Sequence, residues 1–376
     1  MVWRHDNEMQ RMLRDSIDAH VSANHSTDRV RECREMSAGF DLQEWKSMAE
    51  LGWTGVLLSE ESGGTGLPLS ESLPLAEVIG RNLFPEPFVA SAIIAATILN
   101  AAYSKAFQVI AEPLVDGSRV ITLAFQERPS MKSVAEPSVT CKGGKLNGTK
   151  LFVPAWSDIT DLLVTCVLDE KLAIVFVPGN AEGLVASPTK MSDGSLMTTL
   201  KFSGVAIEPE NILLQGQTAL DALNLAIANG TLALCAQMEG LATAAFDITV
   251  DYMKNRVQFN QPIADFQANR FVMVDLNGEI ELGGASWRQA LIDLEKNGFE
   301  AAHVSISAAK ARCSEMVLGV TKASIQYHGG IGFTEDADIG LYLKAALRLS
   351  SWLGGAAYHR AAAYDMYREG QVDAGK

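Results

Sequence analysis

The sequence has 376 residues, of which 48% are hydrophobic and 20% charged, with a formal net charge of −14. A chain of this length exceeds the size at which one hydrophobic core stops growing, so two or three subdomains are expected. The acidic balance excludes an extended surface for nucleic acid or anionic membranes, because contacts to phosphates need clustered Lys and Arg. Any phosphate-bearing ligand must be held by a few local cations and by backbone N–H groups.

The cysteines are scattered along the chain, at positions 33, 141, 166, 235 and 313, with no C-x-x-C pair. Their spacing predicts no metal site, and their odd number indicates a reducing, cytoplasmic location. Residues 1–8 carry charges where a secretory signal needs an apolar run. Because no run of about 18 uncharged apolar residues occurs, we expect no transmembrane helix.

The first part of the chain, residues 1–113, is expected to be helical, since apolar residues recur at helical spacing at Met9, Met12, Leu13, Ile17 and Val21. From 114 to 215 the pattern changes to short β-type runs at 120–125, 162–167 and 172–177. Turn signals such as Asn147-Gly148 separate these runs. The pattern predicts a middle domain formed by an antiparallel sheet or barrel.

Helix returns in the last part of the chain, residues 216–376. A buried stripe that includes Leu234, Met238 and Leu241 marks a long helix, which ends at the turn containing Pro262. Further helices are expected over 272–294, 301–326 and 341–367. Four such helices should pack as a bundle. The predicted fold class is therefore α+β, with an N-terminal helical domain, a middle β domain and a C-terminal four-helix bundle.

The segment from Arg256 to Gln267 follows the long helix. By itself Arg256 could be an ordinary cation that complements the helix C-terminus. Gln258, Phe259 and Gln267 surround it with amides and one flat apolar ring. A guanidinium fork beside amides suits a pyrophosphate group.

A second segment runs from Gln326 to Glu335 and contains Gly329 and Gly330. The glycines alone predict a helix C-cap. Together with Gln326 they favour contact with a ligand, because a missing Cβ lets the backbone approach it closely. We interpret His328, which has no adjacent carboxylate to orient it, as a structural residue.

These two segments, together with the order of helical, β and helical parts, resemble the acyl-CoA dehydrogenase flavoenzymes over nearly the whole chain. The resemblance implies a cofactor, FAD, that is held mainly by a neighbouring subunit. The matching cofactor-binding positions, including the adjacent amide Gln258, are Arg256, Gln258, Phe259, Gln267, Gln326, Gly329 and Gly330. One departure is Asn260, which stands where a glycine is usual.

The resemblance also shows what is missing. The family's catalytic glutamate would fall at Leu353, or near Gly230 and Thr231, and none of these residues can take a proton. Glu239 is interpreted as an ordinary surface charge on the long helix. The flavin and acyl-CoA segment reads Gln126–Ser133 here, and the later strand presents Phe152 and Pro154, where proline offers no donor.

The sequence therefore predicts a β-type subunit of a heteromeric (α2β2) acyl-CoA dehydrogenase for steroid or other bulky acyl-CoA thioesters. Such a chain has no catalytic residue of its own and completes a partner's FAD site. Two alternatives stay open: a self-sufficient homotetramer with a base relocated to Glu239, Glu335 or Asp338, and a non-redox scaffold that binds CoA esters.

The expected partners are an acyl-CoA thioester and a related dehydrogenase subunit in a dimer of dimers. An electron-transfer flavoprotein or oxygen is expected to accept the electrons. Trp287, Trp352 and Leu353 are the predicted apolar anchors between subunits.

Overall fold

The structure is a computed structural model that describes residues 7–24, 26–102, 108–131 and 134–374. Residues 1–6, on which much of the expectation about a secretory signal rests, lie outside the described residues, as do residues 132 and 133. The chain divides into two compact units, and each is described by itself. Unit 1 comprises Met1–Arg29, Leu73–Phe84 and Thr231–Lys376, and unit 2 comprises Val30–Ser72 and Pro85–Gly230.

Helices form the first part of unit 2. They are α2 (Thr27–Cys33), α3 (Leu42–Glu50), the short η1 (Glu60–Ser62), the π-helical η2 (Val89–Ala95) continued by α5 (Ala96–Ala101), and α6 (Gln108–Val115). The Asp41 carboxylate caps α3 by accepting the N–H of Gln43 at 2.8 Å. Every residue of η2 is buried, and the Ser91 hydroxyl donates to the Ile121 carbonyl at 2.7 Å. This bond ties the buried helix to the first strand of the sheet.

The sheet of unit 2 has eight strands, β1 (Val120–Ala124), β2 (Thr140–Lys142), β3 (Lys145–Pro154), β4 (Thr160–Leu168), β5 (Lys171–Val177), β6 (Leu184–Lys190), β7 (Leu196–Ala206) and β8 (Ile212–Gln215). The order is β6-β7-β3-β2-β4-β5-β8, with β1 paired to β4. The expectation of an antiparallel sheet was incomplete, because β1 and β2 both pair with β4 in parallel. Long connections allow this direction, and strand periodicity alone does not reveal it.

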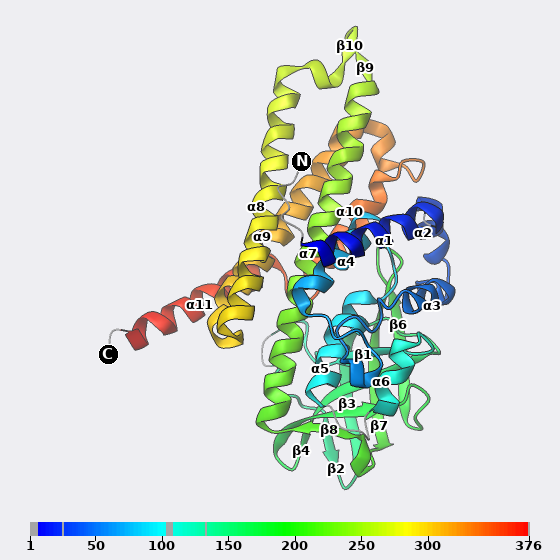
Figure 1. Cartoon of the computed structure of the whole chain (residues 1–376), viewed down its shortest axis with the longest axis vertical. Coiled ribbons are helices and arrows are strands. Elements are labelled where there is room, and N and C mark those ends of the chain that lie inside the picture. The colour runs from blue at the N-terminus through cyan, green and yellow to red at the C-terminus, as the bar shows by residue number, and fades with distance from the viewer. Residues whose placement is uncertain (1–6, 25, 103–107, 132–133, 375–376) are drawn as a thin grey trace. The chain divides into compact units, whose positions relative to one another are not determined.

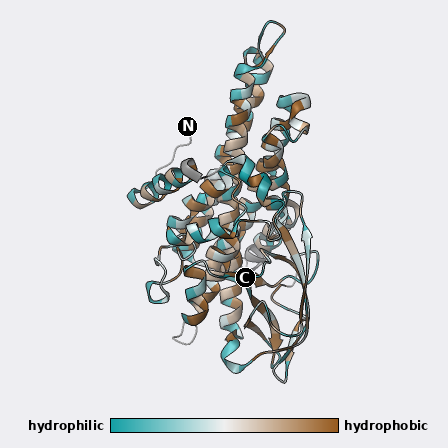
Figure 2. Cartoon of the chain, turned by 90° about the vertical axis from the view of Figure 1, so that its right-hand side faces the viewer, coloured by the Kyte–Doolittle hydropathy of each residue, from teal (hydrophilic) through white to brown (hydrophobic). Residues whose placement is uncertain are grey.

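The core of the sheet is aliphatic, and Figure 2 shows hydrophobic residues concentrated along its strands. β3 alternates between buried and exposed positions, as expected for a strand with one solvated face. β1 is buried throughout.

Unit 1 is helical, apart from one short hairpin. Its elements are α1 (Glu8–Asn24), α4 (Leu69–Arg81), α7 (Gln217–Asn255), β9 (Val257–Gln258), β10 (Gln261–Pro262), η4 (Ile263–Asp265), α8 (Gln267–Asn297), α9 (Phe299–His328), η5 (Gly329–Phe333), α10 (Ile339–Ser351) and α11 (Ala356–Ala374), with α4 and α7 reaching into unit 2. The β9–β10 hairpin joins α7 to α8 at one end of the bundle (Figure 1).

The long helix α7 lies against α4 with unusually close backbones. A Cβ added at Gly240 would come within 1.9 Å of the Glu77 carbonyl oxygen, so only glycine allows this approach. The length and composition of α7 would allow it to cross a membrane, although we expected no transmembrane helix from the sequence. However, 67% of the most apolar window of α7 is buried inside the protein. Such burial is typical of a core helix.

The fourth helix of the predicted bundle is not continuous. It consists of α10 and α11, separated at residues 352–355. Leu353 and Gly354 adopt positive φ angles of 56° and 100°, which end α10. The apolar periodicity continues across the break, and so the sequence predicted one helix over 341–367.

Candidate functional site

The β9–β10 hairpin presents the first signature segment. Phe259 and Asn260, its two central residues, have φ angles of 53° and 66°, as in a type I′ turn. Asparagine tolerates this conformation, which explains how Asn260 replaces the usual glycine. The hairpin is anchored by the N–H of Arg256 on the Tyr252 carbonyl and by the N–H of Ile263 on the Arg256 carbonyl, both at 2.8 Å. Phe259 points outward, with 87% of its surface exposed.

The second signature segment lies at the end of α9, next to α7. The rings of Tyr252 and His328 stack with centroids 4.4 Å apart, and the Tyr252 hydroxyl donates to the His328 carbonyl at 3.3 Å. His328 is buried, and its Nδ1 lies 2.8 Å from the Ser324 carbonyl oxygen. Its role is thus to join the two segments, in agreement with the structural interpretation.

The predicted cofactor-binding residues form an exposed surface of unit 1. The side chains of Arg256, Gln258, Gln267 and Gln326 are exposed. Among the residues that the structure describes, Arg256 makes no ion pair, and no heavy atom lies within 4 Å of a Cβ added at Gly329 or Gly330. A guanidinium outside any ion pair among the described residues, amides and open glycine backbone fit a pyrophosphate group such as that of FAD.

The positions matched to the family's catalytic glutamate carry no acid. Leu353 is buried in the turn between α10 and α11, and Gly230 and Thr231 are buried within α7. The turn itself is well held. His359 lies with Nε2 at 2.9 Å from the Leu353 carbonyl oxygen and Nδ1 at 3.3 Å from the Ser307 hydroxyl. Burial lowers the pKa of His359 to about 4, although the bond to Leu353 opposes this.

A buried lysine completes the turn. The Lys310 ammonium donates to the carbonyl oxygens of Leu349, Ser350 and Gly354 at 3.1–3.2 Å, and to the Ser314 hydroxyl at 3.1 Å. The Leu349 and Ser350 carbonyls belong to the C-terminal end of α10, where a cation is favoured, and the Gly354 carbonyl belongs to the turn that follows. Burial lowers its pKa to about 8. The sequence analysis missed Lys310; its position in the buried stripe of α9 was the available signal.

Glu239 is not a surface charge, and that interpretation was wrong. Its side chain is fully buried, with one oxygen accepting from the Trp287 indole at 2.7 Å and the other from the Arg288 guanidinium at 3.1 Å. Burial raises the pKa of Glu239, and the nearby Glu77 carboxylate raises it further. Helix periodicity failed here because α7 is buried on every face over residues 228–242, so a residue off the apolar stripe is buried as well. The carboxylate fastens α7 to α8.

The other candidates for a relocated base lie near the start of α10. Glu335 is exposed and forms an ion pair with Lys344. Asp338 is the residue that precedes α10, and its carbonyl accepts the N–H of Leu341 at 2.9 Å. Glu335 is thus held as a surface charge, and Asp338 is half-buried at the start of α10.

In unit 2, the positions that the resemblance assigns to the chain's own flavin are poorly suited to it. The Gln126 amide donates to the Arg128 carbonyl at 2.8 Å, and Pro154 has no N–H. Phe152 is partly exposed at a φ of 54°, beside an irregularity in the pairing of β3 with β7. The residues therefore do not fit the donor pattern expected for a flavin ring.

A buried lysine joins the strands that carry these positions. Lys150 is buried and donates to Glu127 at 2.6 Å, to the Thr165 hydroxyl at 2.8 Å and to the Phe125 carbonyl at 3.3 Å. Burial lowers the pKa of Lys150 to about 8, against the opposing effect of Glu127. For Glu127, burial favours a higher pKa, but the bonds from Lys150 and Ser138 outweigh it and lower the pKa.

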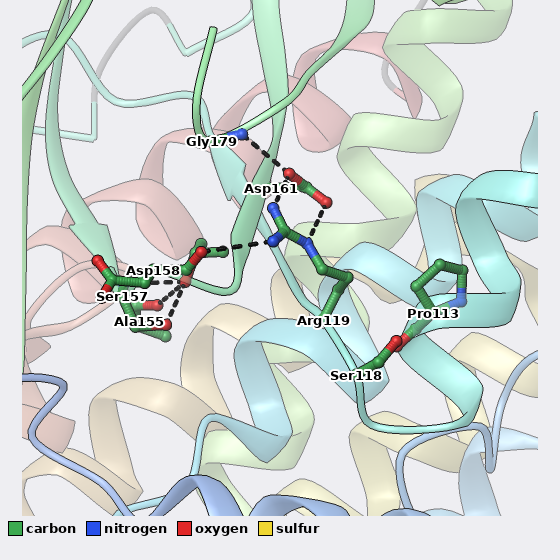
Figure 3. Close-up of polar contacts among 9 residues, drawn as sticks. Pro113, Ser118, Arg119, Ala155, Ser157, Asp158, Asp161 and Gly179 are labelled. Carbon is green, nitrogen blue, oxygen red and sulfur yellow. Dashed lines mark hydrogen bonds and ion pairs between the residues drawn. The ribbon is translucent and has the colours of Figure 1, made fainter.

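A second, partly buried ion pair fixes the turn after β3 (Figure 3). The Arg119 guanidinium forks onto the Asp161 carboxylate, with Nε at 2.8 Å from Oδ2. Asp161 also accepts the N–H of Gly179 at 2.8 Å, and Arg119 donates to the Asp158 carbonyl at 3.4 Å. The fork holds the loop that leads from Pro154 into β4.

Two of the three predicted subunit anchors are wrong. Trp287 and Leu353 are buried inside unit 1, so their side chains cannot reach another chain. Trp352 is half-buried.

Among the described residues, no group of three or more His, Cys, Asp or Glu side chains could hold a metal ion.

Both the sequence and the fold of the chain are similar to those of known proteins. Residues 7–117 match the acyl-CoA dehydrogenase N-terminal domain, and residues 220–365 match the acyl-CoA dehydrogenase C-terminal domain. The chain is 27% identical over 352 residues to the acyl-CoA dehydrogenase IpdE2 of Mycolicibacterium smegmatis, covering 93% of this chain and 95% of that protein.

Two solved structures share the fold over nearly the whole length. One is a variant of the Tcur3481–Tcur3483 steroid ACAD, with a TM-score of 0.85, 28% identity, and coverage of 97% of this chain and 98% of that one. The other is the ChsE4–ChsE5 complex from Mycobacterium tuberculosis, with a TM-score of 0.87, 22% identity and the same coverage. This chain belongs to the acyl-CoA dehydrogenase family, whose members are FAD-dependent oxidoreductases acting on CH–CH groups.

Proposed function

We propose that the chain is a subunit of a heteromeric acyl-CoA dehydrogenase, in which it completes the FAD site of a partner and contributes no base. One observation carries the proposal. The surface suited to another chain's FAD is exposed and free, whereas the positions of the catalytic glutamate and of the chain's own flavin donors are occupied by groups that cannot serve.

Desaturation of an acyl-CoA thioester removes a proton from the α-carbon while a hydride leaves the β-carbon. FAD accepts the hydride when bound, and in this proposal the partner supplies the carboxylate that takes the proton. In that assembly Arg256 neutralises pyrophosphate charge, Gln258, Gln267 and Gln326 donate hydrogen bonds, and Phe259 covers an apolar part of the cofactor. Gly329 and Gly330 let the backbone approach it.

The substrate class is a bulky acyl-CoA thioester, including steroid thioesters. Support comes from the Tcur3481–Tcur3483 protein, which is described as a steroid ACAD. Electrons then pass to an electron-transfer flavoprotein or to oxygen. We also propose a cytoplasmic location, which fits five buried, free cysteines, and the domain boundaries 1–113, 114–215 and 216–376.

Three preparations test the proposal: this chain alone, a glutamate-bearing dehydrogenase chain from the same genome alone, and the two co-expressed. FAD content at about 450 nm and acyl-CoA turnover with an artificial acceptor are measured in each. We expect stable flavin and robust turnover only in the co-expressed complex. Turnover by this chain alone would sink the proposal and support the self-sufficient homotetramer. Acyl-CoA binding without redox activity in any preparation would support the scaffold.

A further inference from the structure

Tyr252 on α7 and His328 on α9 form the contact that links the two signature segments, 256–267 and 326–335. Their rings stack with centroids 4.4 Å apart and an angle of 22° between the planes, and the Tyr252 hydroxyl donates to the His328 carbonyl at 3.3 Å. The two residues lie 76 positions apart in the sequence. Stacked rings contribute more than the area that they bury. The contact therefore fixes the ends of two helices against each other.

Tyr252 is connected directly to the hairpin segment. Its carbonyl accepts the N–H of Arg256 at 2.8 Å, and the Arg256 carbonyl accepts the N–H of Ile263 at 2.8 Å. These two bonds run from the last turn of α7 across the base of the β9–β10 hairpin. A shift of Tyr252 consequently moves Arg256 and the hairpin with it.

His328 is connected equally closely to the glycine segment. It directly precedes Gly329, and its Nδ1 lies 2.8 Å from the Ser324 carbonyl oxygen, which holds the ring on α9. The η5 turn folds back onto this residue. A Cβ added at Gly332 would lie 3.0 Å from the Cβ of His328 and 2.8 Å from the Ile325 carbonyl oxygen, so only glycine allows the approach. The position of His328 thus sets that of the backbone at 329–332.

The exposed polar groups of the two segments are placed through this contact. Arg256 follows Tyr252 by four residues, and Gln326 precedes His328 by two. Both of these side chains are exposed, whereas His328 is buried and Tyr252 is half-buried. A ligand held by two groups at once binds more tightly when their separation is already fixed, because less conformational freedom is lost on binding.

We infer that Tyr252 and His328 are positioning residues, which hold the two signature segments at the separation that one FAD molecule needs. This inference rests on the proposed function, since the ligand is the partner's FAD. Both residues act through others, Arg256 on one side and Gln326 with the adjoining glycines on the other. The stacked pair makes these groups bind the cofactor as one unit rather than as two independent contacts.

The test compares Tyr252→Leu, which removes the ring and its hydroxyl, with Tyr252→Phe, which keeps the ring. Phe299→Leu is the matched control, because Phe299 is a half-buried ring that faces His303, with centroids 6.1 Å apart, at the opposite end of α9. Circular dichroism checks folding, and hydrogen–deuterium exchange is measured on the chain alone. In the complex with the glutamate-bearing chain, fluorescence titration gives the dissociation constant of FAD, and acyl-CoA turnover is measured with an artificial acceptor.

We expect Tyr252→Leu to raise the exchange rate of both segments about tenfold and to weaken FAD binding about tenfold, since a stacked ring is lost. Tyr252→Phe loses one hydrogen bond and should weaken FAD binding only about threefold. Phe299→Leu should stay within about twofold of wild type in both measurements, because it lies far from the segments.

A cycle of Arg256→Ala and Gln326→Ala measures whether the segments act as one unit. In the wild-type background the double variant should lose less FAD affinity than the product of the two single losses, because the advantage of a fixed separation disappears with either contact. In the Tyr252→Leu background the two losses should multiply. The wild-type cycle also tests the inference if Tyr252→Leu does not fold.

FAD affinity at the wild-type level in Tyr252→Leu overturns the inference, whatever the exchange shows, and leaves the proposed function standing. Losses that multiply in the wild-type background also overturn it, because the segments then bind independently. A complex that binds FAD, depends on Tyr252 and shows no turnover supports the inference while the proposed function fails. A wild-type complex without FAD overturns both.

Discussion

The Lys310 ammonium on α9 donates a hydrogen bond to the Gly354 carbonyl at 3.1 Å, so a buried cation holds the turn that contains Leu353. The same ammonium caps the last carbonyls of α10. One buried cation therefore holds the carbonyls on both sides of Leu353.

Lys310→Met is expected to lower the free energy of unfolding by about 3 kcal/mol, because the Leu349, Ser350 and Gly354 carbonyls lose a charged donor, although the Ser314 hydroxyl still donates to Ser350. Chemical denaturation of the purified chain measures this. Lys322→Met, an exposed lysine on the same helix, serves as the control and should change stability by less than about 0.5 kcal/mol. Equal stability of the two variants would show that Lys310 does not support the turn.

His359 should make the protein sensitive to acid. Its pKa in the folded state is about 4, below the usual 6.5, so its contribution to stability is complete above pH 6.5 and is lost as the pH falls toward 4. The loss amounts to about 3 kcal/mol, at 1.36 kcal/mol per pKa unit. The free energy of unfolding, measured with urea at several pH values between 7 and 4, should fall less steeply with decreasing pH for His359→Gln than for wild type. Parallel curves would contradict the assignment.

Leu353→Glu is not expected to restore turnover in the isolated chain, because the Gln126 amide already donates to the Arg128 carbonyl and Pro154 has no N–H to offer a flavin. Burying a carboxylate at this position should also destabilise the fold by about 3 kcal/mol. Leu353→Gln is the matched control without acidity. Acyl-CoA turnover and unfolding are measured on both, and strong activity of the glutamate variant alone would refute this expectation.

Arg256→Ala should weaken the binding of FAD to the assembled complex about a hundredfold. This loss corresponds to about 2–3 kcal/mol for a bidentate charged contact. The apparent dissociation constant of FAD is measured by fluorescence titration of the apo complex. Lys142→Ala, which removes an exposed cation from β2, controls for the change in net charge. Unchanged FAD affinity in Arg256→Ala would exclude the pyrophosphate contact.

Glu239→Gln distinguishes a structural anchor from a relocated base. As an anchor, Glu239 loses its ion pair with Arg288, and the protein should lose about 1–2 kcal/mol of stability while the complex keeps its turnover. Glu315→Gln, in an exposed pair with Arg360, should be nearly neutral. A stable Glu239→Gln protein with abolished turnover would falsify the anchor role.

The sequence by itself determined the order of helical and β parts, the two signature segments and the absence of an acid at Leu353, Gly230 and Thr231. These depend on local periodicity, turn chemistry and residue identity, which a linear sequence carries in full. The β9–β10 hairpin at Phe259 was not predicted, because Phe259-Asn260 lacks the glycine that usually marks a two-residue turn with two positive φ angles.

Only the tertiary structure decided the rest. The parallel pairing of β1 with β4 and the burial of Glu239 depend on which distant segments meet, and pattern within one element does not contain that information. The sequence does not distinguish Lys150 and Lys310 from surface cations, because the acceptors that allow their burial lie on distant segments. The size of Trp287 predicts that it is buried, but only packing shows whether its own chain or another one covers it.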